Sequence, residues 1–249
     1  MIYELAEVIA VVQARVGSVR LPQKVLKSLN GNPAIYHVMT RTKASKLVDK
    51  VYLATSRLDD NNPLESLAET NGWNLFRGSE DDVLSRFIEI TDIEKPKIVV
   101  RVCADNFAID PDVIDLGILE LAKERADLCS AFISSSFPFG VGAEVCTVDC
   151  LKRVEAETRY APATYREHVF KWAIERPKSF RIKPLLAPNS LRRPDISVSV
   201  DTNDDLQNMA KIFSRFVGRE TNFRTRDLIK IWDEMGLATK HSFLPKETG

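Results

Sequence analysis

The sequence lacks an excess of charge of either sign. Thirty-five lysines and arginines balance thirty-five aspartates and glutamates over 249 residues, so the formal net charge is zero. A chain without a global field is poorly suited to hold nucleic acid or an anionic membrane surface, and we expect no such partner. Any anion site must therefore be local, built from a few basic residues at one place.

Long apolar runs are also absent. The longest, such as "VIAVV" and "IVVRVCA", are much shorter than the roughly 20 residues that cross a bilayer. The N-terminus, "MIYELAE", lacks the basic start and the apolar core of a signal peptide. These features predict a cytoplasmic protein.

Cysteine and histidine are scarce. The four cysteines lie in or beside apolar segments, and they show neither the paired spacing of a zinc site nor the density of a disulfide scaffold. They are Cys103, Cys129, Cys146 and Cys150. With only three scattered histidines besides, we expect buried, reduced thiols and no metal centre made of histidine and cysteine.

Two kinds of hydrophobic pattern alternate along the first half of the chain. Short β-rich runs are separated by stretches with helical periodicity. The runs lie at 8–12, 51–54, 98–103 and 128–132, and the helical stretches at about 33–46, 61–71, 80–93 and 111–125. This alternation predicts an α/β fold with a mostly parallel sheet that is covered by helices on both faces.

Helix starts carry clear signals in this half. "GNP" precedes residue 34, Ser79 and Asp82 have the spacing of a capping box, and Pro111 suits a first helical turn. The rhythm changes after about residue 137, where "SSSFPFGVG" interrupts it. We expect one domain over 1–249, in which residues 137–190 form a smaller lobe.

The second half predicts further elements. "AEVCTVDCLKRVEAE" is typical of a strand that runs into a helix, and "TYREHVFKWAIERP" of an amphipathic helix that stops before Pro177. "FRIKPLLAP" and "ISVSVD" predict strands. Two more helices are expected near 203–216 and 225–235.

The loop after the first strand has the composition of a phosphate site. Parallel α/β sheets bind ligands beyond the carboxyl ends of their strands. The loop "ARVGSVRLPQK" carries Arg15, Arg20 and Lys24, with Gly17 and Ser18 between them. Fixed positive charge, an approachable backbone and a hydroxyl suit a polyphosphate. The loop has neither the P-loop ending nor the three spaced glycines of a dinucleotide site, which disfavours a kinase or a dehydrogenase.

Two aspartates stand at other predicted strand ends. Asp105 follows "IVVRVCA" and Asp201 follows "ISVSV". Two carboxylates opposite a basic loop would hold Mg²⁺ by oxygen ligands while the metal bridges a triphosphate. Alternatively, Asp105 starts a turn, and Asp201 is the N-cap of the helix that begins near Asn203.

Several segments, in their order and spacing, resemble one family. They are "QARVGSVRLPQKVL", "VYLATS", "FRGSEDDVLSRF", "VVRVCADNFAIDPDVID", "GVGAEVCTVDCL", "YREHVFKW" and "VSVDTNDDL". Over residues 8–210 the chain resembles the sugar cytidylyltransferases that act on 3-deoxy-manno-octulosonate and acylneuraminate, and it looks closest to the branch called spore-coat polysaccharide biosynthesis protein F. The resemblance implies a Rossmann-like twisted sheet of the nucleotide-diphospho-sugar transferase type, with a small inserted lobe.

The resemblance also implies a set of site residues. Those that would bind CTP are Ala14, Arg15, Ser18, Arg20, Lys24, Arg77, Gly78, Ser79, Val83 and Arg86. Asp105 and Asp201 would bind Mg²⁺, and together with Arg15 and Lys24 they would be catalytic. Those that would line the acceptor side, in a region through which relatives form homodimers, are Glu144, Arg166, Glu167 and His168. Because Arg166, Glu167 and His168 are sequential on a predicted helix, they cannot all face one way, and the alternative is a solvent-facing Arg and Glu with a packed His.

The implied reaction is attack by an acceptor oxygen on the α-phosphorus of CTP, which yields a CMP-activated acidic sugar for cell-surface polysaccharide. The chain departs from the family pattern at Gln23, where glycine is usual, and at "ADNFA", where "GDCPL" is usual. Two alternatives therefore stay open: a nucleotidylyltransferase for a phosphorylated or phosphonate acceptor, and a non-catalytic nucleotide-binding subunit. A metal-dependent glycosyltransferase fits poorly, because its DxD signature is absent after "VRVCA".

Overall fold

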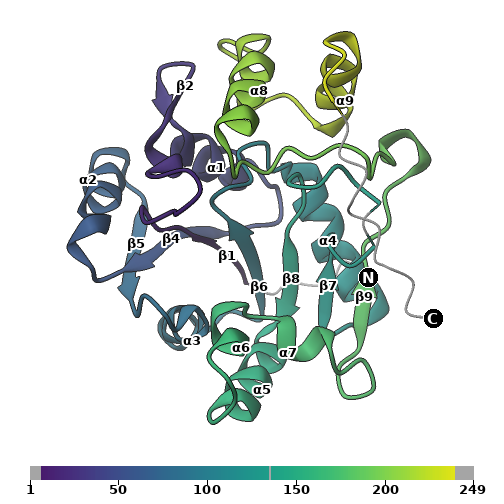
Figure 1. Cartoon of the computed structure of the whole chain (residues 1–249). Helices are drawn as coiled ribbons and strands as arrows, with labels where there is room; N and C mark the ends of the chain where they lie inside the picture. Colours follow the sequence, from purple (N-terminus) through teal and green to yellow (C-terminus); the bar gives the residue numbers. More distant parts are fainter. Residues whose placement is uncertain (1–6, 135, 239–249) are drawn as a thin grey trace.

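The computed structural model describes residues 7–134 and 136–238, and a central sheet organises them (Figure 1). Within this part of the chain, seven strands pair into one sheet. In order of pairing they are β5 (Asn74–Gly78), β4 (Lys50–Ser56), β1 (Val8–Gln13), β6 (Ile98–Cys103), β8 (Glu144–Thr147), β7 (Leu128–Ser130) and β9 (Ile182–Pro184). β8 runs antiparallel to β6 and β7, and the other neighbouring pairs are parallel.

The central strand β1 is buried on both faces, which is why it is a continuous apolar run. Its residues Val8, Ala10 and Val12 belong to one core, here called the upper core, and Ile9 and Val11 belong to a second, the lower core. Alternate side chains of a strand point to opposite faces, so one short segment anchors both layers.

Helices cover the two faces as the alternating pattern predicts (Figure 1). Those that pack on the upper core are α1 (Ala34–Lys43), α2 (Asn62–Asn71), α4 (Pro111–Glu124), α8 (Asn203–Ser214) and α9 (Thr225–Glu234). Those on the other face are α3 (Val83–Glu94), α5 (Val148–Thr158), α6 (Thr164–Glu167) and α7 (Lys171–Ile174). Short 3-10 turns are η1 (Lys24–Leu26), η2 (Asp59–Asn61) and η3 (Asn189–Leu191), and β2 (Ser28–Leu29) pairs with β3 (Asn32–Pro33) as a separate hairpin. The predicted α/β class with a mostly parallel sheet is confirmed.

The structure differs from the sequence predictions in several elements. β5 was not predicted, because it is a short edge strand whose polar residues break the apolar pattern. The predicted strand "ISVSVD" is extended but contributes one isolated bridge, between Ser197 and Phe139, because its backbone bonds to loops instead of to a strand. The predicted helix at 164–176 breaks into α6 and α7 at His168, and the break lets both Val169 and Phe170 reach the lower core.

Aspartate side chains cap the N-termini of α3 and α4. The third helix starts at Val83 and not at residue 80, and Asp82 is its N-cap, accepting from the Ser85 N–H. Asp110 caps α4, with Pro111 in the first turn as predicted. Asp110 also accepts from the backbone and hydroxyl of Thr225, so it joins the start of α4 to the start of α9.

The segment 137–190 supplies β8 and β9 to the same sheet, and its helices α5 and α7 share the lower core with α3. Three of the four cysteines are buried, Cys103 is partly exposed, and all are unpaired. No described helix is long and apolar enough to span a bilayer. The signal-peptide prediction concerns residues 1–6, which lie outside the described residues.

Arg41 of α1 is a fully buried cation that joins α1 to other segments on the same side of the sheet. Its guanidinium donates to the carbonyls of Ile109, Glu220 and Phe223, and it stacks on the Phe223 ring at 3.8 Å. Burial lowers the pKa of Arg41 to about 10, so the group stays charged at neutral pH. Arg41 thereby ties the chain after Asp105 to the segment that leads into α9.

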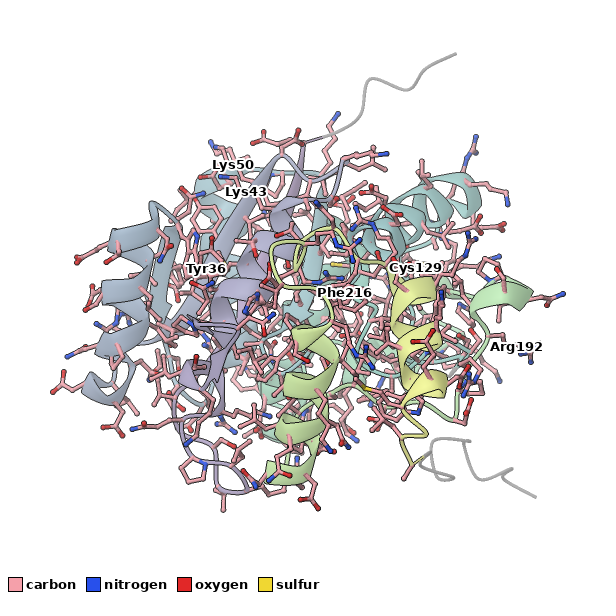
Figure 2. The ribbon with its side chains drawn as sticks, turned by 90° about the horizontal axis from the view of Figure 1, so that it is seen from above. Tyr36, Lys43, Lys50, Cys129, Arg192 and Phe216 are labelled. Carbon is pink, nitrogen blue, oxygen red and sulfur yellow. The ribbon has the colours of Figure 1, made fainter. Side chains whose placement is uncertain are left out.

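We expect the Arg41→Met variant to lose about 3 kcal/mol or more of unfolding free energy in urea, because three carbonyls are left without their donor. The matched control is Arg192→Met, since Arg192 lies exposed at the edge of the molecule (Figure 2). That control should change stability by less than about 0.5 kcal/mol. Equal stability of the two variants would contradict the structural role given to Arg41.

Candidate active site

A cavity of about 430 Å³ opens at the carboxyl ends of β1 and β6, where this class of sheet binds its ligands. The loop after β1 forms one wall, the turn after β6 and the approach to α8 form another, and α3 and α6 contribute the rest. The lining residues are Gln13, Ala14, Arg15, Gly17, Ser18, Val19, Arg20, Lys24, Val83, Arg86, Arg101, Cys103, Ala104, Asp105, Glu167, His168 and Asp201.

Lys24 lies at the centre of the charged part of the cavity. Its Nζ donates to Asp105 Oδ2 at 3.1 Å, to Asp201 Oδ1 at 2.9 Å and to the Val200 carbonyl at 2.9 Å. Arg20 adds a second contact to Asp201 Oδ1, at 2.9 Å. The Lys24 side chain is only 12% exposed, so these contacts are well shielded from water. Two carboxylates far apart in the sequence therefore converge on one ammonium.

The N-cap alternative for Asp201 was wrong. Thr202 is the N-cap of α8, and Asp205 completes the capping box with it. The Asp201 carboxylate does not cap the helix and instead lines the cavity, in contact with Lys24 and Arg20. Asp105 does stand in a turn, as its alternative predicts, and its carboxylate still lines the cavity and accepts from Lys24.

The departure from "GDCPL" falls mostly beneath the cavity. Asn106, Phe107 and Ala108 are buried, whereas Ala104 and Asp105 line the cavity. The altered residues therefore change the packing under the turn, and the aspartate keeps its place on the surface of the site.

The backbone at Gln23 is left-handed, with φ 56° and ψ 28°. Gln23 N–H donates to the Val16 carbonyl, and Val16 N–H donates to Asn61 Oδ1 at 2.9 Å. These bonds close the loop directly before Lys24. A side chain in this region of φ and ψ costs about 1–2 kcal/mol, which glycine avoids.

The remaining loop residues are held more loosely. Arg15 is 53% exposed and lies 3.6 Å from Glu80 and 4.0 Å from Glu167. The Ser18 hydroxyl accepts from the Leu21 N–H at 3.4 Å. Exposed ion pairs of this kind contribute little, so Arg15 can reorient toward a ligand at low cost.

Three residues predicted to bind the nucleotide do not line the cavity. Arg77 donates to the carbonyls of Ser56 and Leu58 and pairs with Glu65. The Ser79 hydroxyl accepts from the Asp82 N–H at 3.1 Å, before α3. Gly78 leaves room for the Arg86 side chain, because a Cβ at position 78 would lie 2.6 Å from Arg86 Cγ.

Arg86, in contrast, lines the cavity. It is buried, and one Nη donates to the Ala54 carbonyl at 3.2 Å. Burial lowers the pKa of Arg86, and the nearby Glu80 opposes that shift. Among the described residues, Arg86 Nε has no hydrogen-bond partner.

The four predicted acceptor residues separate into two pairs. Glu167 and His168 line the cavity. Arg166 instead bonds to Asp82 at 2.7 Å, and Glu144 is buried in an ion pair with Arg101. The break after α6 thus places only part of the "YREH" sequence at the site.

Sequence reasoning missed Gln13, Arg101 and Cys103, which line the cavity below the loop. One signal was available, because Arg101 interrupts the apolar run "IVVRVC" in the middle of a strand. Burial raises the pKa of Cys103 to about 12, so its thiol is neutral at physiological pH and is no nucleophile.

Comparison with known proteins identifies the chain's relatives. The sequence profile described as Cytidylyltransferase matches residues 9–230. The chain is 28% identical over 232 residues to the spore coat polysaccharide biosynthesis protein SpsF of Bacillus subtilis. That alignment covers 90% of this chain and 93% of SpsF.

Solved structures share the fold. A cytidylyltransferase from Leptospira borgpetersenii superimposes with a TM-score of 0.85 at 24% identity, covering 98% of both chains. A CMP:2-keto-3-deoxy-manno-octonic acid synthetase complexed with CTP gives 0.63 at 15% identity, covering 84% of this chain and 99% of that one. Rv0371c from Mycobacterium tuberculosis, in complex with manganese, gives 0.57 at 10% identity, covering 82% of this chain and 98% of that one.

We expect Gln23→Gly to raise the unfolding free energy by about 0.5–1 kcal/mol in a urea titration, because glycine adopts the left-handed backbone without strain. Gln207 provides the control, since it is exposed in the interior of α8. Gln207→Gly should lower stability by about 1 kcal/mol. A loss of stability at both positions would show that the loop at Gln23 is unstrained.

Proposed function

The chain belongs to the cytidylyltransferase family, and from that premise we propose that it transfers CMP from CTP to an acidic sugar with release of pyrophosphate. The product is an activated sugar for cell-surface polysaccharide. The relative SpsF, described as a spore coat polysaccharide biosynthesis protein, and the synthetase of similar fold complexed with CTP both support this proposal. The observation that carries it is the convergence of Lys24, Asp105 and Asp201 in one cavity beside a basic loop.

The reaction needs no protein nucleophile. An acceptor hydroxyl oxygen attacks the α-phosphorus of CTP and loses its proton to water, while the bond from that phosphorus to the pyrophosphate oxygen breaks. Pyrophosphate leaves with the bonding electron pair. Arg15, Arg20 and Lys24 would stabilise the charge that grows on it, because all three are cations of the loop after β1 that line the cavity.

The nucleotide would lie against the loop after β1. Ala14 and Arg15 offer backbone groups to the cytosine, and Ser18 offers a hydroxyl to the phosphates. Arg86 would contribute the positive charge of a buried guanidinium that lines the cavity. Gly78 supports this site indirectly by leaving room for the Arg86 side chain.

The carboxylates fit a divalent cation. Asp105 and Asp201 already bond to one positive centre, Lys24 Nζ, so their oxygens can share a metal once Lys24 turns to the phosphates. Among the described residues, no group of three or more histidine, cysteine, aspartate or glutamate side chains could hold an ion, so phosphate oxygens and water would complete the shell, as Mg²⁺ commonly requires. Held by Asp105 and Asp201, Mg²⁺ would neutralise charge on the phosphates.

The acceptor belongs, in this proposal, on the side of the cavity lined by Glu167 and His168. Both residues lie in the segment 137–190, and we assign to that segment the contact between two copies of the chain. This part of the proposal, like the cytoplasmic location, rests on the family resemblance and on the sequence.

Pyrophosphate release tests the proposal directly. With CTP, Mg²⁺ and a panel of acidic sugars and sugar phosphates, we expect turnover with CTP and an acidic sugar, and little with UTP, GTP or ATP. Lys24→Met should lower kcat by about 10²- to 10³-fold and weaken CTP binding, because a cation at the phosphates is lost.

Each other result of this screen has a clear meaning. Turnover only with sugar phosphates would favour the phosphorylated-acceptor alternative. CTP binding without any turnover would favour a non-catalytic subunit. An unchanged rate in Lys24→Met would contradict the assignment of the loop to the phosphates.

The metal assignment has its own test. Asp201→Asn should raise the Mg²⁺ concentration for half-maximal activity by about tenfold or more, because one of two carboxylate ligands becomes neutral. The control is Asp204→Asn, since Asp204 is exposed in the first turn of α8. Identical Mg²⁺ titrations for the two variants would exclude Asp201 as a ligand.

A further inference from the structure

A charged residue occupies the middle of an otherwise apolar strand. Arg101 of β6 lies opposite Val11 of β1 and opposite Glu144 of β8. Burial lowers the pKa of Arg101, but the nearby carboxylates of Glu144 and Asp105 help to raise it above its ordinary value, so the guanidinium stays charged. A cation this deep in a sheet needs partners, because an uncompensated buried charge is very unfavourable.

Two neighbours hold the Arg101 guanidinium in one orientation. Its Nη1 pairs with the Glu144 carboxylate, whose side chain is 5% exposed, and its Nε donates to Gln13 Oε1 at 2.8 Å. Glu144 and Gln13 belong to the strands on either side of β6. The planar group is therefore clamped across three strands and cannot swing away.

One edge of the guanidinium stays open. Among the described residues, Arg101 Nη2 has no hydrogen-bond partner, and the side chain, 13% exposed, lines the cavity. A fixed, charged donor that faces a cavity binds an oxyanion more strongly than it binds a neutral group.

Arg101 does not belong to the basic loop after β1. Arg20 and Lys24 are on the loop and already contact Asp201. Arg101 instead projects from β6. Because its neighbours Val100 and Val102 point into the upper core, Arg101 points to the other face of the sheet, the face on which α6 with Glu167 lies. Its open donor thus belongs to the part of the cavity that the loop cations do not serve.

We propose that Arg101, clamped by Glu144 and Gln13, binds the oxyanion of the acceptor, a carboxylate or a phosphate, and so selects anionic over neutral sugars. This inference rests on the proposed function, since it names the residue that recognises the anionic group of the acceptor at that same site. Glu144, predicted from the resemblance to line the acceptor side, then acts by orienting Arg101.

Equilibrium binding tests this role without turnover. Calorimetry is performed on the full chain with CTP and no added divalent cation, using 3-deoxy-manno-octulosonate, N-acetylneuraminate, glucose 1-phosphate and glucose as probes. We expect at least one anionic sugar to bind the unaltered protein and glucose not to bind. Whether the carboxylate sugars or the phosphate binds identifies the oxyanion.

The variants separate recognition from folding. Arg101→Gln should weaken binding of the anionic sugar at least tenfold while CTP affinity changes less than threefold. Because this variant leaves Glu144 buried without its partner, the double variant Arg101→Gln with Glu144→Gln removes both charges, and circular dichroism verifies its fold. The matched control is Arg193→Gln, since Arg193 pairs with Asp195 and Asp233 outside the cavity and should leave sugar binding unchanged.

The outcomes distinguish the two proposals. Failure of every anionic sugar to bind the unaltered protein, equal binding by the folded double variant, or an equal loss of CTP affinity would each overturn the role of Arg101. Absence of pyrophosphate release, with anionic sugar still bound through Arg101, would overturn only the proposed function.

Discussion

The contact of one ammonium with two carboxylates organises the site. Lys24 follows β1, Asp105 follows β6 and Asp201 precedes α8, so the three segments meet only if the sheet and the helix above it are both in place. Two carboxylates this close would repel each other, and the shared lysine removes that repulsion. The same arrangement is suited to ligand exchange. A metal cation can replace Lys24 at the two carboxylates, and a polyphosphate can replace the carboxylates at Lys24.

The arginines around that contact have different roles. Arg41 is satisfied by three backbone carbonyls, so its charge serves the fold by joining α1 to the turn after Asp105 and to the C-terminal helices. Arg86 and Arg101 both line the cavity, and each has one nitrogen without a hydrogen-bond partner among the described residues, Nε of Arg86 and Nη2 of Arg101. The Arg86 Nε is buried, whereas the Arg101 Nη2 is not among the buried atoms without a partner, so of these two donors the one on Arg101 is the more accessible to a ligand in the cavity.

Local patterns identified most elements, and the exceptions have local causes. The apolar runs of β1 and β6 are unmistakable, since parallel central strands are buried on both faces. β5 was not predicted, because this edge strand carries polar residues. The predicted helix at 164–176 is divided in two, because Val169 and Phe170 both pack into the lower core. Hydrophobic periodicity cannot predict the edge strand or the helix break, because both depend on the tertiary contacts of the segment.

The sequence by itself determined the class of fold, the basic loop after β1 and the aspartates at the strand ends, because each is written in residues that are neighbours along the chain. Tertiary structure alone decided which of those groups meet. It placed Lys24 between Asp105 and Asp201, and it turned Arg77 and Arg166 away from the cavity. It also clamped Arg101 through Glu144, a pairing set by the register of β6 against β8. Strand register and helix packing are long-range properties, and no local pattern specifies them.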